Sequence, residues 1–216
     1  MPDPTADAAF ATIAAERRAF ADVLDDLDPD QWATASLCGA WNVKEVVVHT
    51  MVGPTGSIAG FASAMLRARG SFDRANQVMV ERRSARPIAE VVADLRDHAD
   101  SRFTPPGASW LAPCTDLLVH RLDALVPLGV PTGRPAELWA PSLDFLLGRS
   151  AARMGFTGRA LPRLTYAATD LDWTGGAGPR VEATAETLAL ALTRRTARLD
   201  DLAGPGTGML QAYAAR

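Results

Sequence analysis

Apolar residues recur with helical spacing through the first two-thirds of the chain. Between residues 8 and 27 they follow a period of about 3.6 residues, at Phe10, Ile13, Phe20, Val23, Leu24 and Leu27. Pro29 comes after this segment, where a helix would have to end. Similar patterns predict helices over 54–69, 72–83, 87–103 and 141–154, and a further helix that begins at Pro113 and is ended by Gly129 and Pro131.

One predicted helix has a well-marked start. Asn42 can cap it, and Glu45, three residues later, can reach back to the cap as in a capping box. His49 follows Glu45 by four residues. It therefore lies in the second turn of this helix.

The pattern changes after Gly155. Alternating apolar residues predict a strand over 161–169, residues 172–179 read as a turn or loop, and 180–183 can return as a short strand. A helix is expected over 185–202, where Gly204-Pro205-Gly206 stops it. The chain is therefore expected to be mainly α, with a helical bundle over 1–155 and a small C-terminal α+β region over 156–216.

Composition narrows the classes of function. With 48% hydrophobic and 22% charged residues the chain should fold as a soluble protein. A net charge of −3 without a basic run argues against a nucleic-acid partner. We find neither a signal peptide nor an apolar run long enough for a membrane span, so we expect a cytoplasmic protein. The oligomeric state cannot be read from the pattern.

Two of the three histidines lie where a metal site would need them. Asp116 and His120 are four residues apart, so a helix places both side chains on one face, and His49 is the second imidazole. Two imidazoles and a carboxylate, with further positions open, suit a catalytic divalent metal rather than a structural one. Asp123 shares the face of His120 and can orient its ring. An ordinary surface pair on a helix is the alternative for Asp116 and His120.

The remaining candidates carry weaker expectations. His98 is expected on a solvated helix face, and Cys38 is expected to be a buried structural thiol. Cys114 lies near a helix start, where a thiolate would be stabilised. Two cysteines do not indicate a disulfide scaffold.

Three segments carry a resemblance to a known family. They are residues 37–49 (LCGAWNVKEVVVH), residues 116–123 (DLLVHRLD) followed by 127–129 (PLG), and residues 168–173 (ATDLDW) continued by 190–204. Together they resemble the mycothiol-dependent maleylpyruvate isomerase family, part of the DinB-like superfamily. The resemblance covers nearly the whole chain in the right order and is weakest between about residues 53 and 87.

The resemblance implies a fold and a metal site. The fold would be a DinB-like four-helix bundle with a small C-terminal region. A divalent metal, commonly zinc, would be held by His49, Asp116 and His120, although the isomerase has glutamate where this chain has Asp116. The isomerase also uses an arginine late in the chain, for which Arg194 and Arg195 are the nearest candidates.

The resemblance also implies a chemistry. A metal with an open position can bind a thiol and lower its pKa. Mycothiol or another low-molecular-weight thiol would then attack a small electrophilic substrate, with isomerisation or thiol transfer as the outcome. A late arginine would suit a substrate carboxylate.

Other functions stay open. The ligand types also allow a two-histidine-one-carboxylate iron oxygenase, but such sites usually lie on β-barrel strands. A non-enzymatic ligand-binding protein could keep the bundle and use its pocket. A metal-free enzyme that has repurposed the pocket is a further alternative, which Asp116 in place of glutamate keeps open.

Overall fold

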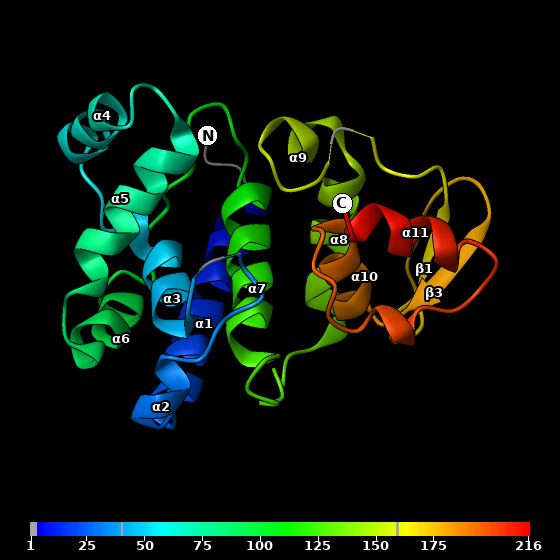
Figure 1. Cartoon of the computed structure of the whole chain (residues 1–216), viewed down its shortest axis with the longest axis horizontal. Coiled ribbons are helices and arrows are strands. Elements are labelled where there is room, and N and C mark those ends of the chain that lie inside the picture. Colours follow the sequence, from blue (N-terminus) through cyan, green and yellow to red (C-terminus); the bar gives the residue numbers. More distant parts are fainter. Residues whose placement is uncertain (1–3, 40, 159) are drawn as a thin grey trace. The chain divides into compact units, whose positions relative to one another are not determined.

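Helices that bury one apolar face make up the first of two compact units, Met1–Val130 (Figure 1). The computed structural model describes residues 4–39, 41–158 and 160–216. The helices of this unit are α1 (Pro4–Asp25), α2 (Pro29–Trp32), α3 (Val43–Val52), α4 (Ile58–Arg67), α5 (Phe72–Ser84), α6 (Ile88–Asp97) and α7 (Leu111–Leu125).

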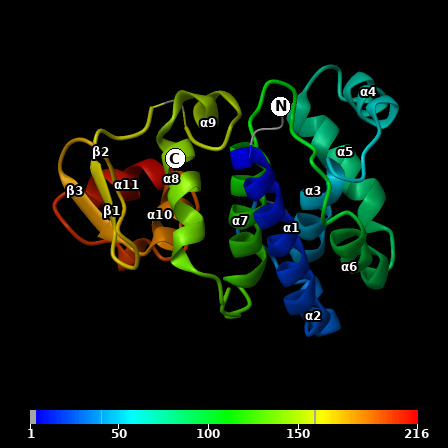
Figure 2. The same cartoon turned by 180° about the vertical axis from the view of Figure 1, so that it is seen from behind.

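The bundle is formed by α1, α3, α6 and α7. Helix α1 packs against α6 and α7, and α3 packs against the same two helices. Figure 2 shows α1 beside α7 from the other side. Helix α4 packs on α5, and α5 packs on α3. The predicted fold class, a DinB-like four-helix bundle with a small C-terminal α+β region, is confirmed.

The predicted apolar stripe of α1 forms part of the bundle core. Ile13, Phe20 and Leu24 are at most 1% exposed. Arg17, also buried, donates from Nη1 to the carbonyl oxygens of Ala99 and Ser101, at 2.8 Å each. These bonds fix the chain just after α6 to α1, so α6 ends at Asp97 instead of continuing to 103 as predicted.

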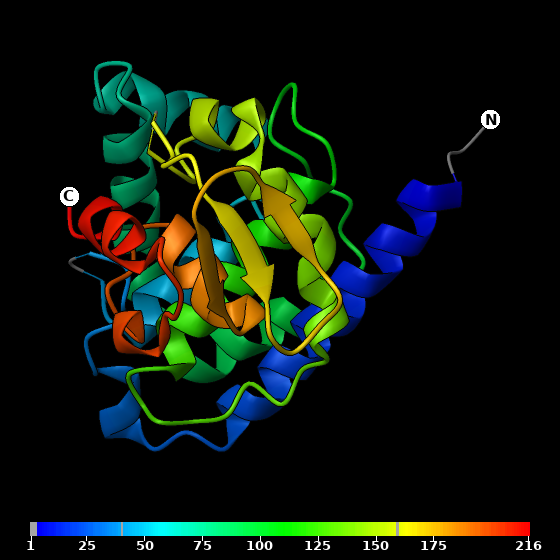
Figure 3. The ribbon, with the colours of Figure 1, turned by 90° about the vertical axis from the view of Figure 1, so that its right-hand side faces the viewer.

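The second unit, Pro131–Arg216, combines short helices with a sheet. Its elements are η1 (Ala136–Trp139), α8 (Ala140–Leu147), α9 (Arg149–Arg153), β1 (Thr165–Ala168), β2 (Thr174–Gly176), β3 (Arg180–Ala183), α10 (Ala185–Leu192), η2 (Leu199–Asp201) and α11 (Thr207–Ala214). The strand order is β2-β1-β3, with β2 antiparallel and β3 parallel to β1 (Figure 3). Tyr166 in β1 pairs with Gly175 and Val181.

A glycine lets the chain cross from β2 to the far edge of the sheet. Gly178 has a φ of +141°, and a Cβ there would lie 2.2 Å from the carbonyl oxygen of Arg163. Only glycine fits this conformation and this approach. The crossing brings β3 into parallel register with β1.

Two predicted helices of this unit are wrong in extent. The segment 141–154 forms α8 and α9, which are separated at Gly148, where the backbone is extended. The helix expected to run to residue 202 ends at Leu192. Strand β2 lies where a loop was predicted, and α11 follows the glycine–proline stop without having been predicted.

The predicted division at residue 155 falls inside the second unit, because α8 packs against α10. As a division into domains, 1–155 and 156–216 stays a prediction. Within the described residues, none of the helices combines the length and the apolar character that a membrane crossing requires.

Candidate metal centre

His49 and the pair Asp116 and His120 come together where α3 packs against α7. The Oδ1 atom of Asp116 lies 3.4 Å from Nε2 of His120 and 3.7 Å from Nε2 of His49. The two imidazole rings meet edge to face with their centroids 4.6 Å apart. One ligand atom of each residue lies within 4.8 Å of the other two.

The local sequence explains how His49 is placed. Asn42 Oδ1 accepts a hydrogen bond from the Glu45 amide at 2.9 Å, and Glu45 Oε2 accepts one from the Asn42 amide at 2.9 Å, so the predicted capping box is confirmed. The fully buried Val43, Val46 and Val47 hold α3 in the core. His49 is thereby turned toward α7.

Each imidazole has a hydrogen-bond partner at its other nitrogen. Nδ1 of His120 donates to Oδ2 of Asp123 at 2.8 Å, and the Asp123 side chain is fully buried. Nδ1 of His49 donates to Oδ1 of Asn76 at 3.0 Å. Because carboxylate and amide oxygens only accept, the neutral rings carry their proton on Nδ1. In a neutral ring the lone pair on Nε2 then lies on the side of Asp116, and a metal that binds there displaces any proton from Nε2.

His120 and Asp116 each stabilise the charged form of the other. Burial would lower the pKa of His120, but Asp116, Asp123 and a hydrogen bond with Cys38 raise it well above its usual value. Burial would likewise raise the pKa of Asp116, but His120 and His49 hold it well below its usual range. Asp116 is therefore an anion, as a carboxylate ligand must be. Its side chain is 33% exposed, so solvent reaches the cluster.

Cys38 lies beside the cluster, and the expectation that it is a buried thiol is wrong. It is half-buried, and its Sγ atom lies within 4.8 Å of a ligand atom of His120 and of one of Asp123. The backbone explains this position, since the Leu37 amide donates to the Asp123 carbonyl at 3.1 Å. Ala40, in the same sequence motif, lies outside the described residues. Cys114 is buried in the first turn of α7.

His98 is not on a solvated helix face. It is the half-buried residue that follows α6, and its Nδ1 lies 3.3 Å from the Asp94 carbonyl oxygen. The candidate metal centre therefore takes two of the three histidines, as the sequence predicts.

Arg194 and Arg195 lie in the turn that ends α10. The Arg195 amide donates to the Leu190 carbonyl and the Arg194 amide to the Ala191 carbonyl, a Schellman motif. Arg194 occupies its left-handed position with a φ of 65°. Arg194 is exposed, and Arg195 donates from Nη1 to the Thr193 carbonyl at 2.8 Å. Both belong to the second unit, and their catalytic role stays a prediction.

Asn76 is the residue of the cluster that the sequence did not reveal. It comes from α5, inside the segment where the sequence resemblance is weakest. A usable signal was present, because Asn76 precedes the fully buried Val80 by four residues and so shares its helix face. An asparagine on a helix face that contributes to a core needs a hydrogen-bond partner.

A comparison with protein families identifies the chain. The model of the mycothiol maleylpyruvate isomerase N-terminal domain matches residues 13–145, which is more than half of the sequence. The chain belongs to the mycothiol maleylpyruvate isomerase family. The match includes α3 and α7, and with them all three candidate ligands.

Solved structures show the same fold for this family member. A mycothiol-dependent maleylpyruvate isomerase aligns with a TM-score of 0.62 and 12% identity, over 96% of this chain and 94% of that chain. A histidine-to-alanine mutant of a mycothiol-dependent maleylpyruvate isomerase aligns with a TM-score of 0.60 at the same identity and coverage. No curated protein sequence matches the chain significantly.

Proposed function

We propose that the protein is a metal-dependent enzyme that activates a low-molecular-weight thiol for attack on a small electrophilic substrate. Mycothiol is the first thiol to consider, and the outcome is isomerisation or thiol transfer. The observation that carries the proposal is the convergence of His49, Asp116 and His120. The Nδ1 atoms of the two histidines are hydrogen-bonded to Asn76 and Asp123, which leaves the Nε2 atoms to face Asp116.

The donor set fits a zinc ion. With bonds of about 2.0–2.1 Å, two ligand atoms of a tetrahedral zinc lie roughly 3.3 Å apart. The distances from Asp116 Oδ1 to the two Nε2 atoms, 3.4 and 3.7 Å, are close to this value. Three protein ligands leave a fourth position, which is the arrangement of a catalytic zinc site.

Residues of the chain take three different roles in this proposal: holding the metal, orienting a ligand and binding the substrate. His49, Asp116 and His120 hold the metal, and Asp123 orients the ring of His120. When bound, the metal supplies a positive charge that lowers the pKa of a thiol at the open position. Arg194 or Arg195 would bind a substrate carboxylate, for which the planar guanidinium is suited.

The family supports the choice of cosubstrate. The chain belongs to a family named for mycothiol and maleylpyruvate isomerisation, and the aligned solved structure is that of a mycothiol-dependent maleylpyruvate isomerase. Maleylpyruvate with mycothiol is therefore the reaction to test first. Other conjugated acids as substrates, and other small thiols as cosubstrates, are to be tested next.

The test is an isomerisation assay on the zinc-loaded protein with and without mycothiol. We expect turnover that needs the thiol, that is lost in His120→Ala and that persists in His98→Ala, whose imidazole lies outside the cluster. Turnover without any thiol, or equal turnover in the two variants, would overturn the proposal.

A further inference from the structure

Asn76 reaches the metal centre from a helix outside the four-helix bundle. Helix α5 begins at the cap Ser71, whose Oγ accepts from the Arg74 amide. The fully buried Ala75 and Val80 fix which face of α5 packs inward. Asn76 is half-buried on the side of α3 and makes the hydrogen bond to His49 described above.

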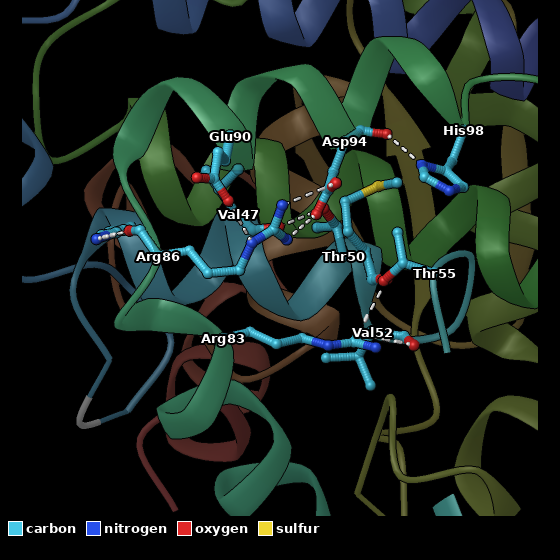
Figure 4. Close-up of polar contacts among 11 residues, drawn as sticks. Val47, Thr50, Val52, Thr55, Arg83, Arg86, Glu90, Asp94 and His98 are labelled. Carbon is cyan, nitrogen blue, oxygen red and sulfur yellow. Dashed lines mark hydrogen bonds and ion pairs between the residues drawn. The ribbon is translucent and has the colours of Figure 1, made fainter. Parts of the chain in front are cut away.

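Side-chain hydrogen bonds hold α5 against α3 and against the segment that leads into α3. In the middle of α5, Gln77 Oε1 accepts a hydrogen bond at 2.6 Å from Nε1 of Trp41, which lies just before α3. Near the end of α5, Arg83 donates from Nη1 to the carbonyl oxygen of Val52 at 3.1 Å, and Figure 4 shows this side chain reaching the last turn of α3. The bonds of Gln77 and Arg83 thus fix α5, and with it the position of the Asn76 carboxamide.

The turn after α5 is fixed as well. Arg86 pairs with Glu90 and Asp94 of α6 (Figure 4). Its carbonyl oxygen accepts a hydrogen bond from Lys44 Nζ at 2.7 Å. Because Lys44 belongs to α3, this bond adds a further connection between α3 and the α5 segment.

His49 is held from several sides. The Trp41 ring lies 4.9 Å from its ring, the His120 ring meets it at 4.6 Å, and Asn76 takes the proton-bearing Nδ1. The aromatic neighbours limit the tilt of the ring. The hydrogen bond to Asn76 engages Nδ1 at 3.0 Å, whereas Asp116 Oδ1 lies 3.7 Å from Nε2, beyond hydrogen-bond distance.

We propose that Asn76 is a positioning residue that fixes the tautomer and the rotation of His49, so that Nε2 faces Asp116 and the metal. The expected effect on metal affinity rests on the proposed metal-dependent function, whereas the hydrogen bond between Asn76 and His49 does not. Histidine ligands of metals usually donate their other N–H to such a partner, and losing that partner weakens metal affinity about 10–100-fold.

The two imidazoles differ in the charge of their partners. Asp123 offers His120 a carboxylate, whereas Asn76 offers His49 a neutral amide. A carboxylate partner makes the imidazole a stronger base and a stronger ligand. Asn76→Asp keeps an acceptor at the same position and should therefore preserve zinc binding.

The first experiment measures zinc affinity by chelator competition for the wild type, Asn76→Ala, Asn76→Asp and the control Arg82→Ala, an exposed residue of the same helix. We expect Asn76→Ala to bind zinc about 10–100-fold more weakly, with Asn76→Asp and Arg82→Ala within about threefold of the wild type. Asn76→Ala within threefold of the wild type, or Asn76→Asp as weak as Asn76→Ala, would overturn the inference.

A second experiment separates this inference from the proposed function. Nitrogen NMR of the metal-free protein, at a pH where the ring is neutral, reports the tautomer of His49. We expect the Nδ1–H form in the wild type and a mixture of the two forms in Asn76→Ala. An unchanged tautomer would overturn the role of Asn76, whereas a wild type that binds no metal but shows the expected tautomers would overturn the proposed function alone.

Discussion

The side chains of the candidate centre show why a carboxylate four residues before a histidine is not an incidental surface pair here. His120 is 8% exposed and Asp123 is fully buried behind it. Burying a carboxylate costs free energy unless it is hydrogen-bonded, and the bond to His120 Nδ1 meets that need. Asp116, in contrast, keeps part of its surface in solvent. The buried acid suits an orienting role and the exposed one a ligand.

Replacing Asp116 tests its role at the scale of a single residue. Asp116→Asn keeps the shape but removes the charge, so we expect zinc affinity to fall by more than about 100-fold, since even indirect partners cost 10–100-fold. Asp116→Glu keeps the charge on a side chain one methylene longer, and we expect it to retain a full equivalent of zinc. Competition with a chelator measures both.

The comparison between the two variants decides the interpretation. Equal zinc affinity in Asp116→Asn and the wild type would exclude Asp116 as a ligand. Loss of zinc in Asp116→Glu alone would instead mean that the packing of α3 on α7 fits only the shorter side chain.

At the scale of elements, the sequence predicts best where a local signal and the packing agree. The start of α3 is such a case, because the capping box of Asn42 and Glu45 forms as expected. The i, i+4 relation of Asp116 and His120 on α7 holds for the same reason. The pairing of α3 with α7 could be expected only from the family resemblance.

Elsewhere local signals were overridden or absent. The helix expected over 185–202 ends at Leu192, because Arg194 takes up a left-handed conformation and the Arg195 amide donates to the Leu190 carbonyl. Strand β2 consists of Thr174–Gly176, which has little strand preference, and exists through its pairing with β1. Helix α11 spans only Thr207–Ala214, too short for a clear periodic pattern.

The cap of α3 gives a prediction at this scale. Asn42→Ala removes the acceptor for the Glu45 amide, so we expect the free energy of unfolding to fall by about 1 kcal/mol. Ser57→Ala removes the corresponding cap of α4, where Ser57 Oγ accepts from the Gly60 amide. Denaturant unfolding measures both variants.

Zinc affinity then distinguishes the effect of Asn42→Ala from that of Ser57→Ala. Because His49 lies on α3, we expect Asn42→Ala to weaken zinc binding and Ser57→Ala to leave it unchanged. If Ser57→Ala weakened zinc binding as much as Asn42→Ala, the effect would reflect general loss of stability.

For the whole molecule, the three candidate ligands all belong to one of the two compact units. His49, Asp116 and His120 lie within Met1–Val130, whereas Arg194 and Arg195 lie within Pro131–Arg216. The metal-centre prediction therefore concerns the first unit alone, and the catalytic role of Arg194 or Arg195 stays a prediction.

Metal binding should stabilise the first unit selectively. A ligand at 100 times its dissociation constant adds about 2.7 kcal/mol to the folded state that binds it. We expect zinc to slow hydrogen exchange mainly in α3 and α7, with little change in α8, α10 and α11. Equal slowing in both units would contradict this assignment of the site, and His49→Ala should abolish the effect.

The most direct test of the metal centre is the metal content of the purified, untagged protein, measured by elemental analysis beside His49→Ala, His120→Ala and His98→Ala. We predict close to one equivalent of zinc or a similar divalent metal in the wild type and in His98→Ala, and its loss in the other two variants. No metal in the wild type after reconstitution, or the same content in all three variants, would show that His49, Asp116 and His120 do not form a metal centre.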